Sequence, residues 1–98
     1  MKFAILLFVA LCISGFGDNS KIKDAVRASL VDPDSAKFGK LSVVNKNKAC
    51  VTVNSKNSMG GYSGNQQAFM LKSEKKWLVL NITNALNHDE CIEFLSTH

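Results

Sequence analysis

Apolar residues recur every three to four positions over residues 21–30, a spacing typical of an amphipathic helix. Asn19 or Ser20 can cap this helix. Pro33 ends it, because the residue before a proline is disfavoured in the helical region. Charged residues lie off the stripe, so we expect the helix to pack on a sheet. The stripe comprises Ile22, Ala25, Val26, Ser29 and Leu30.

Alternating apolar and polar residues predict β-strands in four later segments. In one of them, Val51 and Val53 lie on one face, and Cys50 and Thr52 lie on the other. Residues 77–80 are apolar on both faces, which is typical of an interior strand rather than an edge strand. The four predicted strands are residues 36–44, 49–53, 67–72 and 76–82.

A last helix has its own start signal. Asn87 is placed as the N-cap, and Glu90 is placed as its capping-box partner. Leu86 is placed to pack on Cys91, which lies on the apolar face of the helix. We therefore predict an α+β fold with an N-terminal helix, four mainly antiparallel strands and a short C-terminal helix, in a single domain over residues 18–98.

The start of the chain is typical of a secretory signal peptide. Residues 3–13 are apolar and follow Lys2, and the segment at 14–17 supplies small residues, with Gly15 and Gly17 in the two small-residue positions of a cleavage site. This apolar run is shorter than the roughly 20 residues that a membrane-spanning helix needs, so we expect no transmembrane anchor. We predict that residues 1–17 are removed by cleavage after Gly17 and that the protein is exported, most simply to the periplasm.

Cys12 raises the alternative of a lipoprotein signal, in which the cysteine becomes the lipidated first residue. Such signals carry a small residue before the cysteine, whereas this chain has Leu11. We therefore expect ordinary cleavage, which discards Cys12.

Cys50 and Cys91 remain in the exported chain, in a compartment that permits disulfides. We predict that they pair and join the C-terminal helix to the sheet. A bridge that closes a loop of about 42 residues stabilises a fold on the order of 4 kcal/mol by restricting the unfolded chain.

Composition and charge exclude several function classes. The net charge is +4, and the lysines are dispersed without arginine clusters, so we expect no nucleic-acid partner. Cys91 and His88 have the spacing of a thiol and a base on one helix, but a bridged Cys91 has no thiolate to offer. We predict that the protein is not an enzyme, and we assign no catalytic residue, no metal site and no cofactor.

The stretch from residue 54 to residue 66 is a long connection for a small domain, and such loops are usually functional or disordered. Amides and hydroxyls surround Met59 and Tyr62, a composition typical of binding loops. The alternative is turn chemistry, in which glycines adopt positive φ angles and Asn and Ser side chains bond nearby backbone groups. The sequence supports both interpretations.

Two motifs carry a resemblance. The sequence Asp-Pro-Asp-Ser-Ala-Lys-Phe at 32–38 is followed by a hairpin that begins at Cys50, runs through Lys56-Asn57 and ends in Gly-Gly-Tyr-Ser-Gly at 60–64, with Phe69 beyond it. This pattern resembles a family of small exported proteins of Gram-negative bacteria and their phages. The likeness covers about residues 22–80 and excludes Cys91. It implies a periplasmic setting and no mechanism.

We predict a non-enzymatic binding protein, such as an inhibitor, immunity or exclusion factor, that acts on an envelope or periplasmic protein. The alternative is a binding module for cell-wall glycan or peptide, in which Tyr62 stacks on the ligand while Asn57, Asn65 and Gln66 bond it. The sequence does not indicate an oligomeric state. The predicted partner-binding residues are Lys56, Asn57, Met59, Gly60, Gly61, Tyr62 and Gly64.

Overall fold

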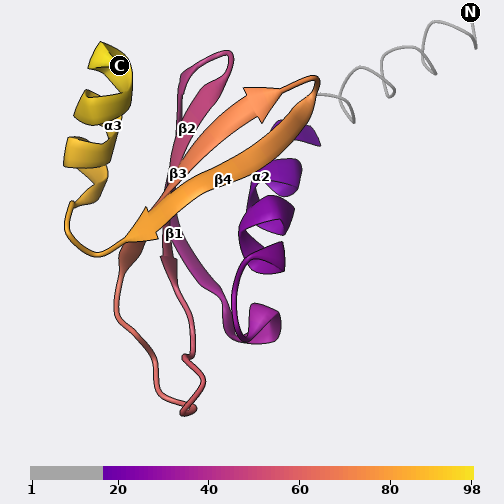
Figure 1. Ribbon diagram of the computed structural model, residues 1–98, viewed down its shortest axis with the longest axis vertical. Helices are drawn as coiled ribbons and strands as arrows, with labels where there is room; N and C mark the ends of the chain where they lie inside the picture. The colour runs from indigo at the N-terminus through magenta and orange to yellow at the C-terminus, as the bar shows by residue number, and fades with distance from the viewer. Residues whose placement is uncertain (1–16) are drawn as a thin grey trace, which may run out of the picture.

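The computed structural model describes residues 17–98, which form a four-stranded antiparallel sheet with a helix against each face (Figure 1). Each strand pairs with the next, in the order β1-β2-β3-β4. The α+β fold predicted from the sequence is confirmed. The predicted signal peptide falls almost entirely on residues 1–16, outside the described part. The elements are α2 (Gly17–Ala28), the 3-10 turn η1 (Pro33–Ser35), β1 (Lys37–Asn45), β2 (Lys48–Asn54), β3 (Gln66–Ser73), β4 (Lys76–Thr83) and α3 (His88–Thr97).

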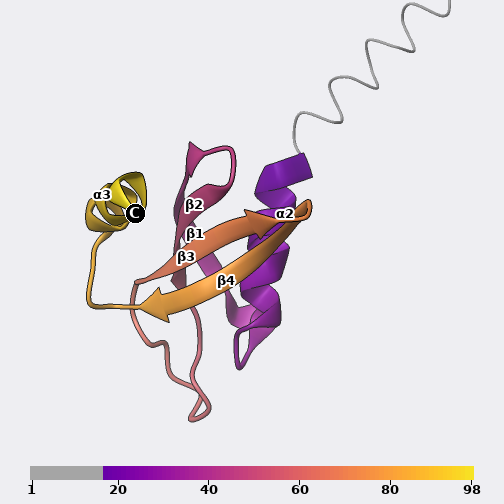
Figure 2. The same ribbon diagram turned by 45° about the horizontal axis from the view of Figure 1, so that its top comes forward.

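The larger part of the core lies between α2 and the sheet. Ile22 and Val26 of α2 are fully buried against the strands. Alternation along β2 directs Ala49, Val51 and Val53 to this face, as predicted for the two valines. Figure 2 shows α2 on one side of the sheet and α3 on the other. The remaining buried members of this core are Ala68, Met70 and Trp77.

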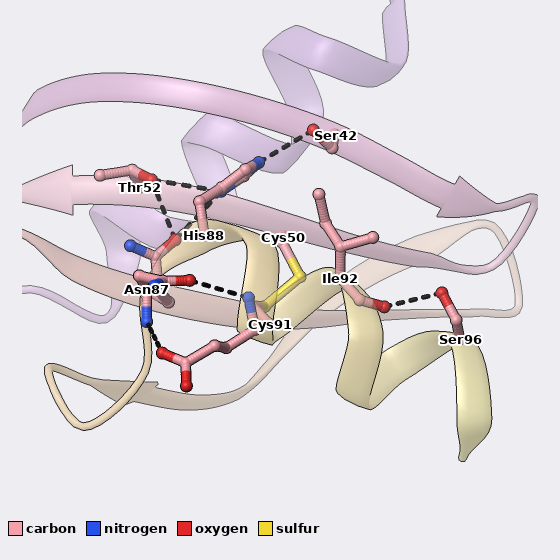
Figure 3. Close-up of a disulfide and its surroundings, with 10 residues drawn as sticks. Ser42, Cys50, Thr52, Asn87, His88, Cys91, Ile92 and Ser96 are labelled. Atoms are coloured by element: carbon pink, nitrogen blue, oxygen red, sulfur yellow. Dashed lines mark hydrogen bonds between the residues drawn. A yellow bond between two sulfur atoms is a disulfide. The ribbon is translucent and has the colours of Figure 1, made fainter.

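The opposite face of the sheet is covered by α3 and closed by a disulfide. Cys50 of β2 bonds Cys91 of α3, with 6.2 Å between their Cα atoms, which confirms the predicted pairing. Both cysteines are fully buried beside Phe69 and Leu95. The disulfide therefore fixes the C-terminal helix covalently to the second strand of the sheet (Figure 3).

The start of α3 follows the predicted capping box. The Asn87 side chain accepts a hydrogen bond from the backbone N–H of Glu90 at 2.9 Å, and the Glu90 carboxylate accepts one from the backbone N–H of Asn87 at 2.9 Å. Leu86 packs against the apolar cluster that contains Cys91, as expected of the residue before the cap. The capping box thus fixes where α3 begins after the last strand, β4.

The first helix lies earlier in the chain than the sequence predicts. Within the described residues α2 begins at Gly17, so Asn19 and Ser20 lie inside it and do not cap it. It ends at Ala28 because Ser29 donates from both its backbone N–H and its hydroxyl to the carbonyl of Val26, at 3.0 and 2.8 Å, which tightens the final turn.

The prediction of an interior position for residues 77–80 is wrong. They belong to β4, which pairs with β3 and with no further strand of residues 17–98, so β4 is an edge of the sheet. Its two faces differ: Trp77 is buried against α2, whereas Leu78 and Leu80 are exposed. No helix within the described part of the chain is long and apolar enough to cross a membrane.

Candidate functional site

The connection between β2 and β3 is an ordered extension of their hairpin. It projects beyond the sheet at the end opposite the β1–β2 turn (Figure 1). Lys56 and Tyr62 form an antiparallel bridge across it, and the backbone N–H of Ser63 donates to the carbonyl of Ser55 at 3.0 Å. We call residues 56–64 the tip. The two sides of the tip are therefore hydrogen-bonded to each other as in a short β-hairpin.

The end of the tip is organised by Asn57. Its side-chain oxygen accepts hydrogen bonds from the backbone N–H groups of Met59 and Gly61, at 2.9 and 3.3 Å. Its own N–H donates to the carbonyl of Gly61 at 2.8 Å. Gly60, with a φ of 86°, provides the left-handed residue that the reversal requires. The predicted turn chemistry is thus present.

A second contact fixes the base of the tip to η1. The hydroxyl of Ser35 accepts a hydrogen bond from the backbone N–H of Lys56 at 2.8 Å. The carbonyl of Ser35 accepts one from the hydroxyl of Tyr62 at 3.2 Å. These bonds join the Asp-Pro-Asp-Ser turn to the Gly-Gly-Tyr hairpin, so the two motifs form one structural unit.

The tip presents an apolar residue beside a basic, aromatic surface. Met59 is 92% exposed and is the most exposed large apolar residue of the described chain. The ammonium group of Lys37 lies 4.5 Å from the centroid of the Tyr62 ring, and that of Lys56 lies 5.8 Å from it. Lys37 is on β1 and escaped the sequence prediction, because nothing in the chain placed it near the hairpin.

The predicted partner-binding residues divide into two groups. Lys56, Met59 and Tyr62 offer side chains on the surface of the tip, and Gly61 is open, since a Cβ there would meet no atom within 4 Å. Asn57, Gly60 and Gly64 instead stabilise the backbone conformation of the tip. Gly64 has a φ of 89°, and its N–H donates to the side-chain oxygen of Asn54 at 3.0 Å.

The four residues predicted to bind a cell-wall glycan lie apart from one another. The Asn57 side chain is used within the tip. Asn65 lines a polar cavity of about 590 Å³ beside the start of α3, whereas Gln66 lines a different cavity of about 220 Å³ beside the end of α2. Tyr62 belongs to neither lining. No single recess within the described residues therefore collects these four side chains.

A buried polar cluster, which the sequence did not reveal, surrounds His88 on the α3 face of the sheet. Gln67 accepts a hydrogen bond through its side-chain oxygen from the hydroxyl of Thr52 at 2.9 Å. The same oxygen lies 3.0 Å from His88 Nδ1, and the hydroxyl of Ser42 lies 2.9 Å from His88 Nε2. Figure 3 shows the imidazole ring between Ser42 and Thr52.

These partners determine which ring nitrogen carries the proton. The oxygen of Gln67 can only accept, so the Nδ1 of His88 donates to it and the Nε2 accepts from the hydroxyl of Ser42. Burial, and secondarily the positive charge of Lys40, lowers the pKa of His88 below its ordinary value, although Asp89 opposes this. His88 is therefore neutral at pH 7.

A serine hydroxyl beside a neutral imidazole has the donor geometry of a nucleophile and its base. Thr52, Gln67 and His88 line the polar cavity, but Ser42 does not. A nucleophile has to reach the substrate, so the position of Ser42 favours a structural explanation. The cluster satisfies the buried groups of His88 and holds the start of α3 against β1, β2 and β3.

Residues 17–98 contain no group of three or more His, Cys, Asp or Glu side chains that could hold a metal ion. Comparison of the chain with protein-family models, curated proteins and solved structures finds no match. The resemblance to small exported proteins of Gram-negative bacteria and phages stays a prediction.

Proposed function

We propose that this protein is a small exported, non-enzymatic binding protein that uses its tip to contact a protein of the bacterial envelope. An inhibitor, immunity factor or exclusion factor acts in this way. The observation that carries the proposal is an ordered tip that exposes Met59 while its backbone is held by Asn57 and Ser35. A loop that is ordered before binding loses little conformational entropy when it meets its partner.

The chemistry of the tip suggests the chemistry of the partner. Met59 is flexible and polarisable, so it can fill an apolar recess of irregular shape. Lys37 and Lys56 add positive charge around the Tyr62 ring. A partner with an apolar recess bordered by carboxylates would complement both features.

Export is supported by two independent features. The sequence predicts a signal peptide over residues 1–17, and the fold contains a buried disulfide between Cys50 and Cys91. Disulfides of this kind form and persist in oxidising compartments such as the periplasm. We therefore place the partner in the periplasm or at a membrane surface that faces it.

The test is site-specific photo-cross-linking in living cells. A photoreactive residue at position 59 is expected to give one discrete adduct that contains an envelope protein, and Tyr62→Ala in the same chain should reduce its yield about tenfold. The matched control carries the photoreactive residue at Lys46, an exposed position in the β1–β2 turn. It should give no such adduct.

Equal adducts from positions 59 and 46 would count against the tip as the contact. The glycan alternative has its own outcome: purified cell-wall sacculi would sediment the protein, and Tyr62→Ala would release it. Sedimentation with sacculi in the absence of a protein adduct would replace the proposed function with glycan binding.

A further inference from the structure

The cavity of about 220 Å³ beside the end of α2 is a recess at the base of the tip. Sites for small molecules usually measure about 300 to 1,000 Å³, so this recess has room for a side chain rather than for such a ligand. Leu30, Val31 and Ile82 form an apolar wall, and Lys56 and Ser63 of the tip also line the recess. The recess is therefore continuous with the surface that we propose as the contact.

Ser55 lines this recess with a hydroxyl that no other described residue uses. The residue is 6% exposed, and its hydroxyl forms no hydrogen bond within residues 17–98. In this part of the chain, the only fully enclosed side-chain nitrogen or oxygen without a hydrogen-bond partner is Nε1 of Trp77. The hydroxyl of Ser55 is therefore not enclosed, and it reaches the recess. Polar groups on buried residues are normally hydrogen-bonded, so this hydroxyl points to a bonding group from outside the fold.

Two further polar groups of the recess are free to bond. Within the described chain, the hydroxyl of Ser63 and the carboxamide of Gln66 form no side-chain hydrogen bond. Both residues have an ordered backbone, because the N–H of Ser63 donates to the carbonyl of Ser55 at 3.0 Å and Gln66 begins β3. Hydroxyl and carboxamide groups can all donate hydrogen bonds. Ser55, Ser63 and Gln66 therefore offer donors to an acceptor that enters the recess.

The charge of the recess favours an anionic acceptor. Lys56 is the single charged residue of the described lining, which contains no Asp or Glu. A carboxylate only accepts hydrogen bonds, and its bonds are stronger than those of a neutral acceptor. Ammonium and guanidinium groups only donate, and the charge of Lys56 would repel them. The net charge of +4 on the whole chain also favours an acidic partner.

We propose that the recess receives a glutamate side chain of the envelope protein that the tip contacts. The carboxylate accepts hydrogen bonds from Ser55, Ser63 and Gln66. Glutamate fits better than aspartate, because its longer apolar stem covers more of the wall that contains Val31. This inference rests on the proposed function and deepens it, since it assigns one acidic side chain of the partner to one place beside the tip.

The first test extends the photo-cross-linking to the recess. A photoreactive residue at Val31, 72% exposed at the rim, is expected to give an adduct with the same envelope protein as position 59. Ser55→Ala should lower the yield from position 59 about fivefold, because it removes a hydrogen bond to a charged group. Gln66→Glu should lower it at least about tenfold, because it keeps the shape of the side chain and adds a repelling charge.

The matched control for the added charge is Ser73→Glu, at an exposed residue at the other end of β3. Its yield from position 59 should equal that of the natural chain. Far-ultraviolet circular dichroism of each variant confirms that the fold is retained.

The second test needs no partner protein. The protein, exported from its full chain and labelled with nitrogen-15, is titrated with the α-amide of N-acetylglutamate and followed by nuclear magnetic resonance. The probe should shift the backbone amides of Ser55, Ser63 and Gln66. The α-amide of N-acetylglutamine has nearly the same shape without the charge, and it should bind at least about fivefold more weakly.

Equal shifts from the two probes, or no shift at these amides, would overturn the inference. So would an adduct from position 59 that Tyr62→Ala weakens and Gln66→Glu leaves unchanged, a result that would keep the proposed function. A yield that Gln66→Glu increases would indicate a cationic occupant and would also overturn it. Shifts that the charged probe confines to the recess support a carboxylate site there even if position 59 gives no adduct.

Discussion

At the scale of single residues, His88 connects the stability of the fold to pH. The residue is 8% exposed, and its ring bonds Ser42 and Gln67 in the neutral form. Burial, the larger cause, and the charge of Lys40 both lower its pKa. A charged imidazole is therefore less favourable in the folded chain than in the unfolded one.

We expect the free energy of unfolding to decrease as the pH falls below 6.5, the ordinary pKa of histidine. The unfolded chain binds the proton first, so the stabilisation is complete above 6.5 and is lost as the pH falls toward the lower pKa of the folded state. Urea titrations between pH 7.5 and pH 5, compared with His88→Gln, measure this contribution apart from that of the carboxylates. Lys40→Gln should reduce the pH-dependent loss. Identical pH slopes for the natural chain and His88→Gln would contradict the assignment.

The cluster around His88 also shows what a sequence hides at this scale. Ser42, Thr52 and Gln67 belong to three different strands, and each is an unremarkable polar residue where it stands in the chain. Only the register of the strands brings them to one imidazole. The spacing of these residues along the sequence therefore does not predict that they contact the same histidine.

At the scale of elements, local signals predicted most of the structure. Alternation identified the four strands to within one residue at each end, and the capping box of Asn87 and Glu90 identified the start of α3. The order of the tip was not predictable, because one of its anchors is Ser35, which lies in η1 on the far side of β1 and β2 in the sequence. The edge position of β4 was missed for a related reason: a strand's own residues do not reveal how many neighbours it has.

The tip offers a prediction of its own. Asn57→Ala removes the acceptor for the N–H groups of Met59 and Gly61, so these amides should exchange with solvent about tenfold faster. The free energy of unfolding should change by no more than about 1 kcal/mol, because the site is exposed. Hydrogen exchange followed by mass spectrometry measures the first effect.

The control for this measurement is Ser58→Ala, at an exposed neighbour with no side-chain hydrogen bond in the described structure. It should leave both amides unchanged. An unaltered exchange rate in Asn57→Ala would mean that the side chain of Asn57 is not what orders the tip.

At the scale of the whole molecule, the two helices are attached in different ways. α2 is held by apolar contact through Ile22 and Val26, whereas α3 is held by the bond between Cys50 and Cys91 as well as by its own contacts. The buried residues on the α3 face are fewer. The covalent bond therefore carries a larger share of the stability on this side.

Replacing both cysteines, as Cys50→Ala/Cys91→Ala, should lower the free energy of unfolding on the order of 4 kcal/mol, because the unfolded chain regains the freedom of the closed loop. Chemical denaturation followed by tryptophan fluorescence reports this through Trp77. The natural chain treated with a reductant should behave like the double variant. A loss below about 1 kcal/mol would show that the contacts of α3 suffice without the bond.

The two hydrogen bonds at Ser35 have a consequence for the ancestry of the chain. They tie the Asp-Pro-Asp-Ser turn to Tyr62 and Lys56, although two complete strands, β1 and β2, separate the partners along the sequence. The Ser35 hydroxyl bonds a backbone N–H and the Tyr62 hydroxyl bonds a backbone carbonyl, so distant relatives that fix the tip to η1 should keep each of these two side chains, while the β1–β2 hairpin between them varies freely in length. A search for homologues of this chain should therefore combine the two motifs into one discontinuous pattern.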